Sequence, residues 1–154
     1  MIDTSSATNW YRAGDPLRSA VEYLAASSSL FNWVGVYILN GDVLELGPYI
    51  GAATEHKRIT VGVGVCGTAV ARNADMNVPD VAASDNYLAC SIETRSELVV
   101  LIRDHRGNVV GQIDIDSHTP DAFGAREEQL VRNVAAELGA HWADAVGTRP
   151  PVSD

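Results

Sequence analysis

Apolar residues recur at helical spacing near both ends of the chain. Four of them follow Asp15-Pro16 at intervals that predict a core-facing helix: Leu17, Ala20, Val21 and Leu24. Asp15 is a suitable side-chain cap, and proline is favoured at the first helical position. A second helix is predicted over Arg126–Val146, because one side of it carries an apolar stripe: Leu130, Val131, Val134, Leu138, Trp142 and Ala145.

Between these helices, β-branched and aromatic residues form short runs that predict strands. Trp33–Leu39 and Val43–Leu46 are joined across Asn40-Gly41, the strongest short signal for a β-hairpin. Gly47-Pro48 either ends the second run or marks a bulge. The remaining middle segments are predicted to be two short strands, a short helix and an irregular loop: Arg58–Val61, Asn77–Asp80, Thr68–Arg72 and Ala82–Ile92.

The stretch from Glu97 to Asp116 predicts a second hairpin, with strands over Leu98–Arg103 and Val109–Ile115. Side chains alternate along a strand, so Gln112, Asp114 and Asp116 point to one face while Ile113 and Ile115 point to the other. Folding the hairpin places Glu97 roughly opposite Asp114, within one register step. Three carboxylates would then share one face of a sheet.

Such a cluster of like charges is destabilising, so something must compensate for it. The candidates are a cationic ligand, a raised pKa, or exposure to solvent. Charges on a strand are most often solvated, but the residues around this cluster are as apolar as those of a core strand.

The order of elements predicts an α+β fold with a central antiparallel sheet, not alternating βαβ units. We expect a single domain over residues 15–147, with an N-terminal arm over 1–14 and a C-terminal tail over 148–154.

Gly62, Gly64 and Gly67 spell GxGxxG, but this dinucleotide fingerprint requires a parallel βαβ unit, so we reject it. The glycines instead deliver Cys66 to the start of a short helix, where the free N–H groups favour a thiolate. The alternative is that Cys66 is a small buried apolar residue.

Composition narrows the classes of function. The formal net charge of −9 over 154 residues argues against binding to nucleic acid or to an anionic membrane surface. The first residues show neither a basic start nor an apolar stretch, so no signal peptide is expected and a cytoplasmic location is favoured. In a cytoplasmic protein, the two cysteines of this chain are not expected to form a structural disulfide. The four histidines lack metal-ligand spacing, so neither a metal nor another cofactor is expected.

These segments together resemble GAF domains, and more narrowly the free methionine-(R)-sulfoxide reductases. The resemblance spans residues 30–117 and is carried by six segments: NWVGVY (32–37), LELGPY (44–49), RITVGVGVCGTAV (58–70), YLAC (87–90), SELVV (96–100) and GQIDIDS (111–117). It implies a GAF-like fold, with about six antiparallel strands flanked by N- and C-terminal helices. It also implies reduction of free methionine-(R)-sulfoxide in a pocket over the sheet.

The resemblance assigns roles to seven residues. Cys90 matches the cysteine that attacks the sulfoxide sulfur, and Cys66 matches a second redox cysteine. Three carboxyls match those that hold the substrate, and two aromatic residues match those beside its methyl group: Glu97, Asp114, Asp116, Trp33 and Tyr37. A thioredoxin-like protein would restore the thiols.

One position departs from the family pattern. A third cysteine usually stands ten residues before the GVCG cysteine, and here that position is His56. Cys66 or an external thiol would then have to resolve oxidised Cys90. The alternatives are a non-catalytic GAF module that binds a small ligand as a sensor, or a module that forms a homodimer.

Overall fold

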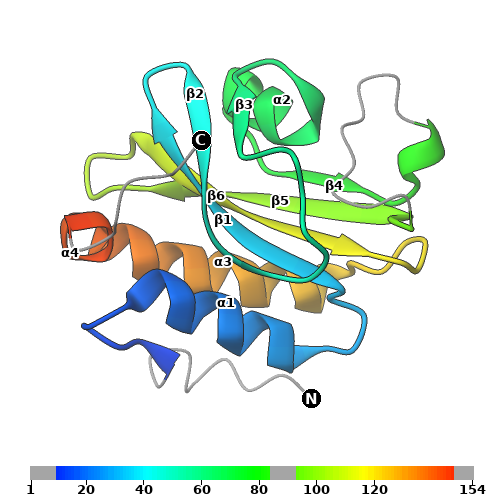
Figure 1. Cartoon of the computed structure of the whole chain (residues 1–154), viewed down its shortest axis with the longest axis horizontal. Coiled ribbons are helices and arrows are strands. Elements are labelled where there is room, and N and C mark those ends of the chain that lie inside the picture. The colour runs from blue at the N-terminus through cyan, green and yellow to red at the C-terminus, as the bar shows by residue number, and fades with distance from the viewer. Residues whose placement is uncertain (1–9, 84–92, 148–154) are drawn as a thin grey trace.

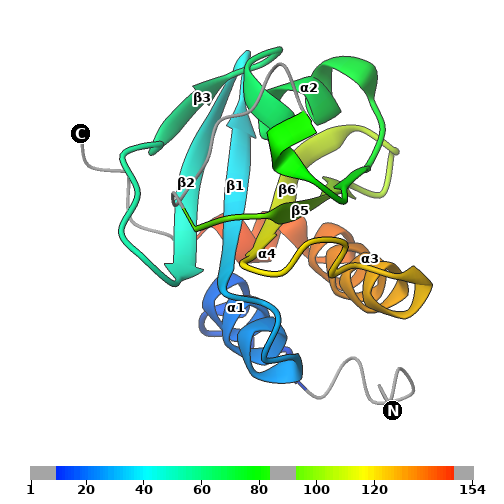
Figure 2. The ribbon, with the colours of Figure 1, turned by 90° about the vertical axis from the view of Figure 1, so that its right-hand side faces the viewer.

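The computed structural model describes residues 10–83 and 93–147. In this part of the chain, one six-stranded sheet separates two layers of helices (Figures 1 and 2). The strands are β1 (Trp33–Asn40), β2 (Val43–Ile50), β3 (Arg58–Thr60), β4 (Met76–Val78), β5 (Ser96–Arg103) and β6 (Val109–Ser117). The helices are α1 (Pro16–Ser27), α2 (Gly64–Arg72), the 3-10 turn η2 (Val81–Ala83), α3 (Ala125–Ala140) and α4 (Trp142–Gly147).

The sheet has the strand order β3-β2-β1-β6-β5-β4, and all of its pairs are antiparallel. This confirms the predicted α+β class and the predicted hairpins β1–β2 and β5–β6. Gly47-Pro48 marks a bulge and does not end its strand, because β2 continues to Ile50 and its register with β1 shifts between Gly35 and Tyr37.

The two faces of the sheet have different coverings. In Figures 1 and 2, α1 and α3 lie on one side and α2 lies on the other. The side under α1 and α3 holds the larger apolar core, to which β6 contributes Ile113 and Ile115. A smaller apolar cluster under α2 includes Trp33, Tyr37 and Cys66. Alternation along β6 therefore turns its acidic residues toward the α2 side.

The predicted helix Arg126–Val146 is wrong in one respect, because it is two helices separated at His141. The backbone of His141 leaves helical geometry at φ −120° and ψ 28°. Just before it, Gly139 lies so close to the carbonyl of Arg103 that a Cβ there would collide. The break after this close approach lets the Trp142 ring pack beside Gly111 of β6.

Both ends of the described chain bind to this body. The α1 cap is the predicted one, since the Asp15 side chain accepts a hydrogen bond from the Arg18 backbone N–H at 3.3 Å. Trp10 is buried and stacks on Tyr23, with 6.2 Å between the ring centroids. Within residues 10–83 and 93–147, no helix is both long and apolar enough to cross a membrane.

Candidate functional site: a buried carboxyl cluster beside a thiol

Three acidic residues lie together on the α2 side of the sheet. Glu97, Asp114 and Asp116 (the carboxyl cluster) are only 2%, 0% and 1% exposed. Glu97 pairs across the strands with Asp116, two residues further along β6 than expected, while Asp114 pairs with Val99. A bulge near the turn accounts for one of these two residues, because Arg103 pairs with Val109 whereas Ile102 pairs with Gly111. The expectation that the acids share one face holds, and solvent exposure is not what compensates their charges.

Burial makes the electrostatics of this cluster unusual. The pKa of Glu97 is raised well above its ordinary value of 4.5, first by desolvation and then by the nearby charges of Asp114 and Asp116. Hydrogen bonds with these two carboxylates stabilise the protonated form of Glu97 further. Glu97 therefore keeps a proton at pH values where an exposed glutamic acid has lost it. The cluster contains a proton donor next to anionic oxygens.

Cys66 brings a thiol to the same cluster. It lies in the first turn of α2, is buried, and its Sγ is 3.8 Å from Glu97 Oε2. The glycine-rich turn makes this approach possible, because a Cβ on Gly67 would stand 2.5 Å from the carbonyl oxygen of Thr60 on β3. Gly64 adopts a φ of +65°, which glycine tolerates without strain, as the helix begins. The helix thus starts four residues before the predicted Thr68.

Gln112 fixes the backbone of the cysteine residue. Its side chain is fully buried and donates a hydrogen bond from Nε2 to the carbonyl oxygen of Cys66 at 3.0 Å. Gln112 occupies the same face of β6 as Asp114, so this strand holds the start of α2 and also carries two of the three carboxyls. The alternation along β6 predicts Gln112 on this face but assigns it no role. A buried amide in line with two buried acids is the signal that could have found it.

Trp33 and Tyr37 lie on the same side, as their spacing of four predicts. The Trp33 indole N–H donates to the carbonyl oxygen of Ala52 at 3.0 Å, and its ring stacks on Tyr49 at 5.3 Å between centroids. The Tyr37 hydroxyl donates to the carbonyl oxygen of His56 at 2.8 Å. Both aromatic residues therefore hold the connection between β2 and β3. His56 contributes its backbone to this contact.

Cys90 lies outside the described residues. Its predicted position over the carboxyl cluster stays a prediction from the sequence, and the thiol that the described part of the chain brings to the acids is Cys66.

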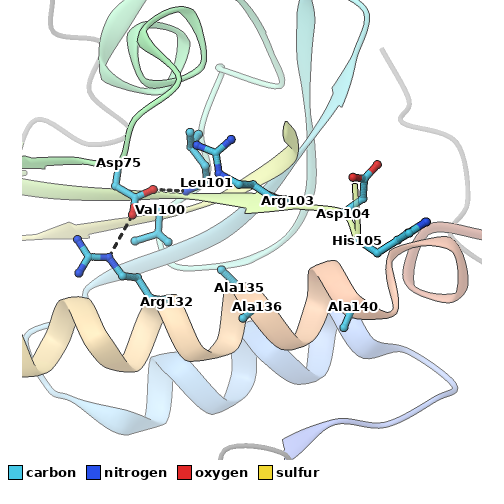
Figure 3. Close-up of a pocket in the computed structure, with 10 residues that line it drawn as sticks. All are labelled: Asp75, Val100, Leu101, Arg103, Asp104, His105, Arg132, Ala135, Ala136 and Ala140. Carbon is cyan, nitrogen blue, oxygen red and sulfur yellow. Dashed lines mark hydrogen bonds and ion pairs between the residues drawn. The ribbon is translucent and has the colours of Figure 1, made fainter. Parts of the chain in front are cut away.

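A separate cavity of about 470 Å³ opens between α3 and the edge of β5 (Figure 3). Its rim includes Asp75, which accepts a hydrogen bond from the Leu101 backbone N–H at 2.8 Å and pairs with Arg132 at 3.2 Å. Three alanines of α3 form its floor: Ala135, Ala136 and Ala140. None of the six predicted site residues that the structure describes lines this cavity, so it is distinct from the carboxyl cluster.

The fold and the site agree with a known family. The family model of the GAF domain matches residues 16–142, and the chain belongs to that family. Within it, the chain is similar to proteins that reduce a sulfoxide. It is 41% identical over 107 residues to "Free methionine-R-sulfoxide reductase" of Escherichia coli, an alignment that covers 70% of this chain. The chain spans less than two thirds of the length of the curated relatives that carry this name, 64% for the E. coli protein.

Solved structures of proteins with the same name resemble this chain over a larger share of its length. A type II free methionine-R-sulfoxide reductase from Thermoplasma acidophilum superposes with a TM-score of 0.77 at 33% identity, covering 88% of this chain and 92% of that one. The free methionine-R-sulfoxide reductase from Neisseria meningitidis, solved in complex with its substrate, superposes with a TM-score of 0.80 at 29% identity. That match covers 92% of this chain and 84% of the other.

Proposed function

We propose that this chain reduces free methionine-(R)-sulfoxide to methionine with a cysteine thiol. The observation that carries the proposal is the buried carboxyl cluster with the Cys66 thiol 3.8 Å from Glu97. A thiol beside a proton donor is the pair of groups that sulfoxide reduction requires. The similarity to named reductases supports the same substrate.

The charge of the cluster suits the ammonium group of a free amino acid. Three buried carboxyls that share protons still leave negative charge on the α2 side of the sheet, and a cation bound there would relieve their repulsion. A methionine residue inside a protein has no ammonium group next to its side chain. The cluster would therefore select the free amino acid over the protein-bound form.

The reaction can be written with atoms and electrons in balance. The thiol of Cys90, the residue that the resemblance assigns to this step, attacks the sulfoxide sulfur. Glu97 donates its proton to the sulfoxide oxygen, which prepares that oxygen to leave. The S–O bond of the substrate breaks and the S–O bond of a cysteine sulfenic acid forms, which leaves methionine, and the thiol proton of Cys90 replaces the proton that Glu97 gave. The sulfur of the cysteine is oxidised by two electrons and that of the substrate is reduced by two.

Recycling requires a second thiol. Condensation of the Cys90 sulfenic acid with the Cys66 thiol would give a disulfide and release one water molecule. A thioredoxin-like dithiol would then reduce the disulfide by exchange and become oxidised itself. This route uses the two cysteines of the chain and places the reaction in a reducing compartment, the cytoplasm.

A coupled assay tests the proposal. Fully reduced protein is mixed with thioredoxin, thioredoxin reductase and NADPH, and NADPH oxidation is followed after addition of free methionine-(R)-sulfoxide. We expect turnover with the free (R)-epimer and little with its N-acetylated form, which lacks the ammonium group. Folded, reduced protein that oxidises no NADPH with the free (R)-epimer would contradict the proposal, provided that a dithiol such as dithiothreitol also fails to support methionine formation.

The second candidate is a GAF sensor that binds a small amino acid without converting it. His56 favours it, because the family's third cysteine would stand there. Both candidates predict binding of methionine sulfoxide, so a titration does not separate them. Methionine formation does, since a sensor releases the sulfoxide unchanged.

A further inference from the structure

Three possible metal ligands converge inside the site from three separate elements. Cys66 Sγ on α2, a carboxylate oxygen of Glu97 on β5 and one of Asp114 on β6 all lie within 4.8 Å of one another. All three residues are buried. They lie far apart in the sequence, so no short spacing of histidines and cysteines predicts this group.

The separation of the thiol and the first carboxyl fits two ligands of a single ion. Zn²⁺ binds thiolate sulfur at about 2.3 Å and carboxylate oxygen at about 2.0 Å, so a tetrahedral site separates sulfur from oxygen by about 3.5 Å. The observed separation between Cys66 Sγ and Glu97 Oε2 is 3.8 Å. An ion could therefore be accommodated by a small shift of these two side chains.

An independent feature next to the thiol also indicates a ligand. The Gln112 side chain is fully buried, and its Oε1 accepts no hydrogen bond from the described residues. Its Nε2 is held 3.0 Å from the carbonyl oxygen of Cys66, so the amide lies against the residue that carries the thiol. Gln112 also shares a strand face with Asp114. A buried carbonyl oxygen without a donor is costly, and a cation or its bound water would satisfy it.

The chemistry of the ligands narrows the choice of ion. Calcium and magnesium prefer oxygen ligands, whereas a thiolate favours softer ions such as Zn²⁺, Co²⁺ or Cd²⁺. Asp114 contributes negative charge, and Glu97 contributes it when the ion replaces its proton. The bound ion then offsets the repulsion between the two carboxylates, as the proton does in its absence.

We propose that Cys66, Glu97 and Asp114 bind a thiophilic divalent cation, with Zn²⁺ as the physiological candidate, and that the bound ion blocks the site. Binding of the ion does not depend on the reductase activity. The blocking rests on the proposed function, because the ion would occupy the carboxyls that hold the substrate ammonium and would withhold the Cys66 thiol from recycling.

Cobalt titration of the full chain tests the binding. The protein is reduced, freed of metal with a chelator and titrated with Co²⁺ while the near-ultraviolet sulfur-to-cobalt charge-transfer band is recorded. We expect a band that saturates at one ion per chain and that excess Zn²⁺ removes. Cys66→Ser should abolish the band, and Glu97→Gln should weaken cobalt binding by about 100-fold, given that even residues behind the ligands matter 10–100-fold.

A matched control variant makes the result specific. Glu22→Gln removes an exposed carboxyl on α1 and should keep the band and the affinity of the wild type. A band that survives Cys66→Ser, or that disappears in Glu22→Gln, would overturn the site. Folded wild-type protein that gives no cobalt band would also overturn the site. Circular dichroism melting curves of each variant show that it is folded.

Turnover separates this inference from the proposed function. A protein that binds Co²⁺ as described but never forms methionine supports the cation site and contradicts the reductase. A protein that forms methionine but gives no cobalt band supports the reductase and overturns the cation site. If both hold, saturating Zn²⁺ should stop turnover and a chelator should restore it, and unchanged turnover with Zn²⁺ bound would overturn the blocking.

Discussion

The two faces of the sheet use the same strands for different purposes. On the side of α1 and α3, β6 contributes Ile113 and Ile115 to a continuous apolar core. On the side of α2, the intervening residues of the same strand are Gln112, Asp114 and Asp116, equally buried but polar. Burial of apolar groups stabilises the fold, whereas burial of like charges opposes it. We therefore propose that the first face maintains the structure and that the second carries the chemistry.

The largest effect should come from removing the proton donor of the second face. Glu97→Gln keeps the size of the side chain but cannot donate the same proton to the sulfoxide oxygen. We expect the rate of methionine formation to fall by about 10²–10⁴-fold, the usual contribution of a general acid. Steady-state turnover measures it. Glu22→Gln, at an exposed position of α1, is the control, and an equal loss in both variants would contradict the acid role.

A change on the first face should lower the stability of the fold and leave the turnover of the folded protein unchanged. Leu138 is fully buried in the core beneath α3, so Leu138→Ala should lower the free energy of unfolding by about 2–5 kcal/mol. Urea denaturation measures this loss. The turnover of the folded fraction should remain near that of the wild type. A fall in turnover as large as that of Glu97→Gln would contradict the claim that the first face serves stability and the second serves turnover.

The stability of the second face should depend on pH in a defined direction. The folded-state pKa of Glu97 is raised above 4.5, so below that pH the residue is protonated in both the folded and the unfolded state and costs nothing. As pH rises from 4.5 to the folded-state pKa, the unfolded state loses this proton more readily, and stability falls. Glu97→Gln should therefore be more stable than wild type at pH 7, by about 1 kcal/mol.

Denaturation of the two proteins at pH 4 and pH 7 measures this difference. The difference in stability between Glu97→Gln and wild type should disappear at pH 4, where the Glu97 carboxyl is neutral in the folded and the unfolded state. A variant that is less stable than wild type at pH 7 would show that the Glu97 carboxylate stabilises the fold, contrary to its burial among like charges.

The smallest effect should come from the contact between Tyr37 and the connection between β2 and β3, next to the second face. Tyr37→Phe removes the hydroxyl that donates to the His56 carbonyl oxygen at 2.8 Å and keeps the ring. The loss of one such hydrogen bond should cost about 0.5–1.5 kcal/mol of stability, as measured by thermal unfolding. Leu39→Val, a conservative change in the same strand, is a suitable comparison. A cost above that of Leu138→Ala would mean that this border supports the whole fold.

Much of this architecture follows from local sequence signals. Asn40-Gly41 and the alternation of β6 were sufficient to predict both hairpins and the face that carries the acids. These signals did not predict the register, because Glu97 pairs with Asp116 and not with Asp114, and a bulge near Arg103 accounts for one of the two residues of this difference. The break at His141 follows a close approach of Gly139 to Arg103, which is distant in the sequence. Local patterns do not contain such contacts.

The site shows the same limit. Alternation and the apolar surroundings predicted that the carboxyls share a face. The approach of Cys66 to Glu97 and the bond from Gln112 to the Cys66 backbone join residues 31 and 46 positions apart, and only the packing of α2 on the sheet creates them. The predicted roles of the seven site residues remain predictions that the variants above can test.

A single-turnover experiment tests the central claim most directly. Fully reduced protein, without thioredoxin, is mixed with excess free methionine-(R)-sulfoxide, the methionine formed is counted, and dimedone traps any sulfenic acid for mass spectrometry. The account predicts about one methionine per chain. It also predicts that Cys66→Ser, which lacks the second thiol, accumulates a dimedone adduct at Cys90. No methionine above the level given by alkylated protein would contradict the claim that this face of the sheet is an active site.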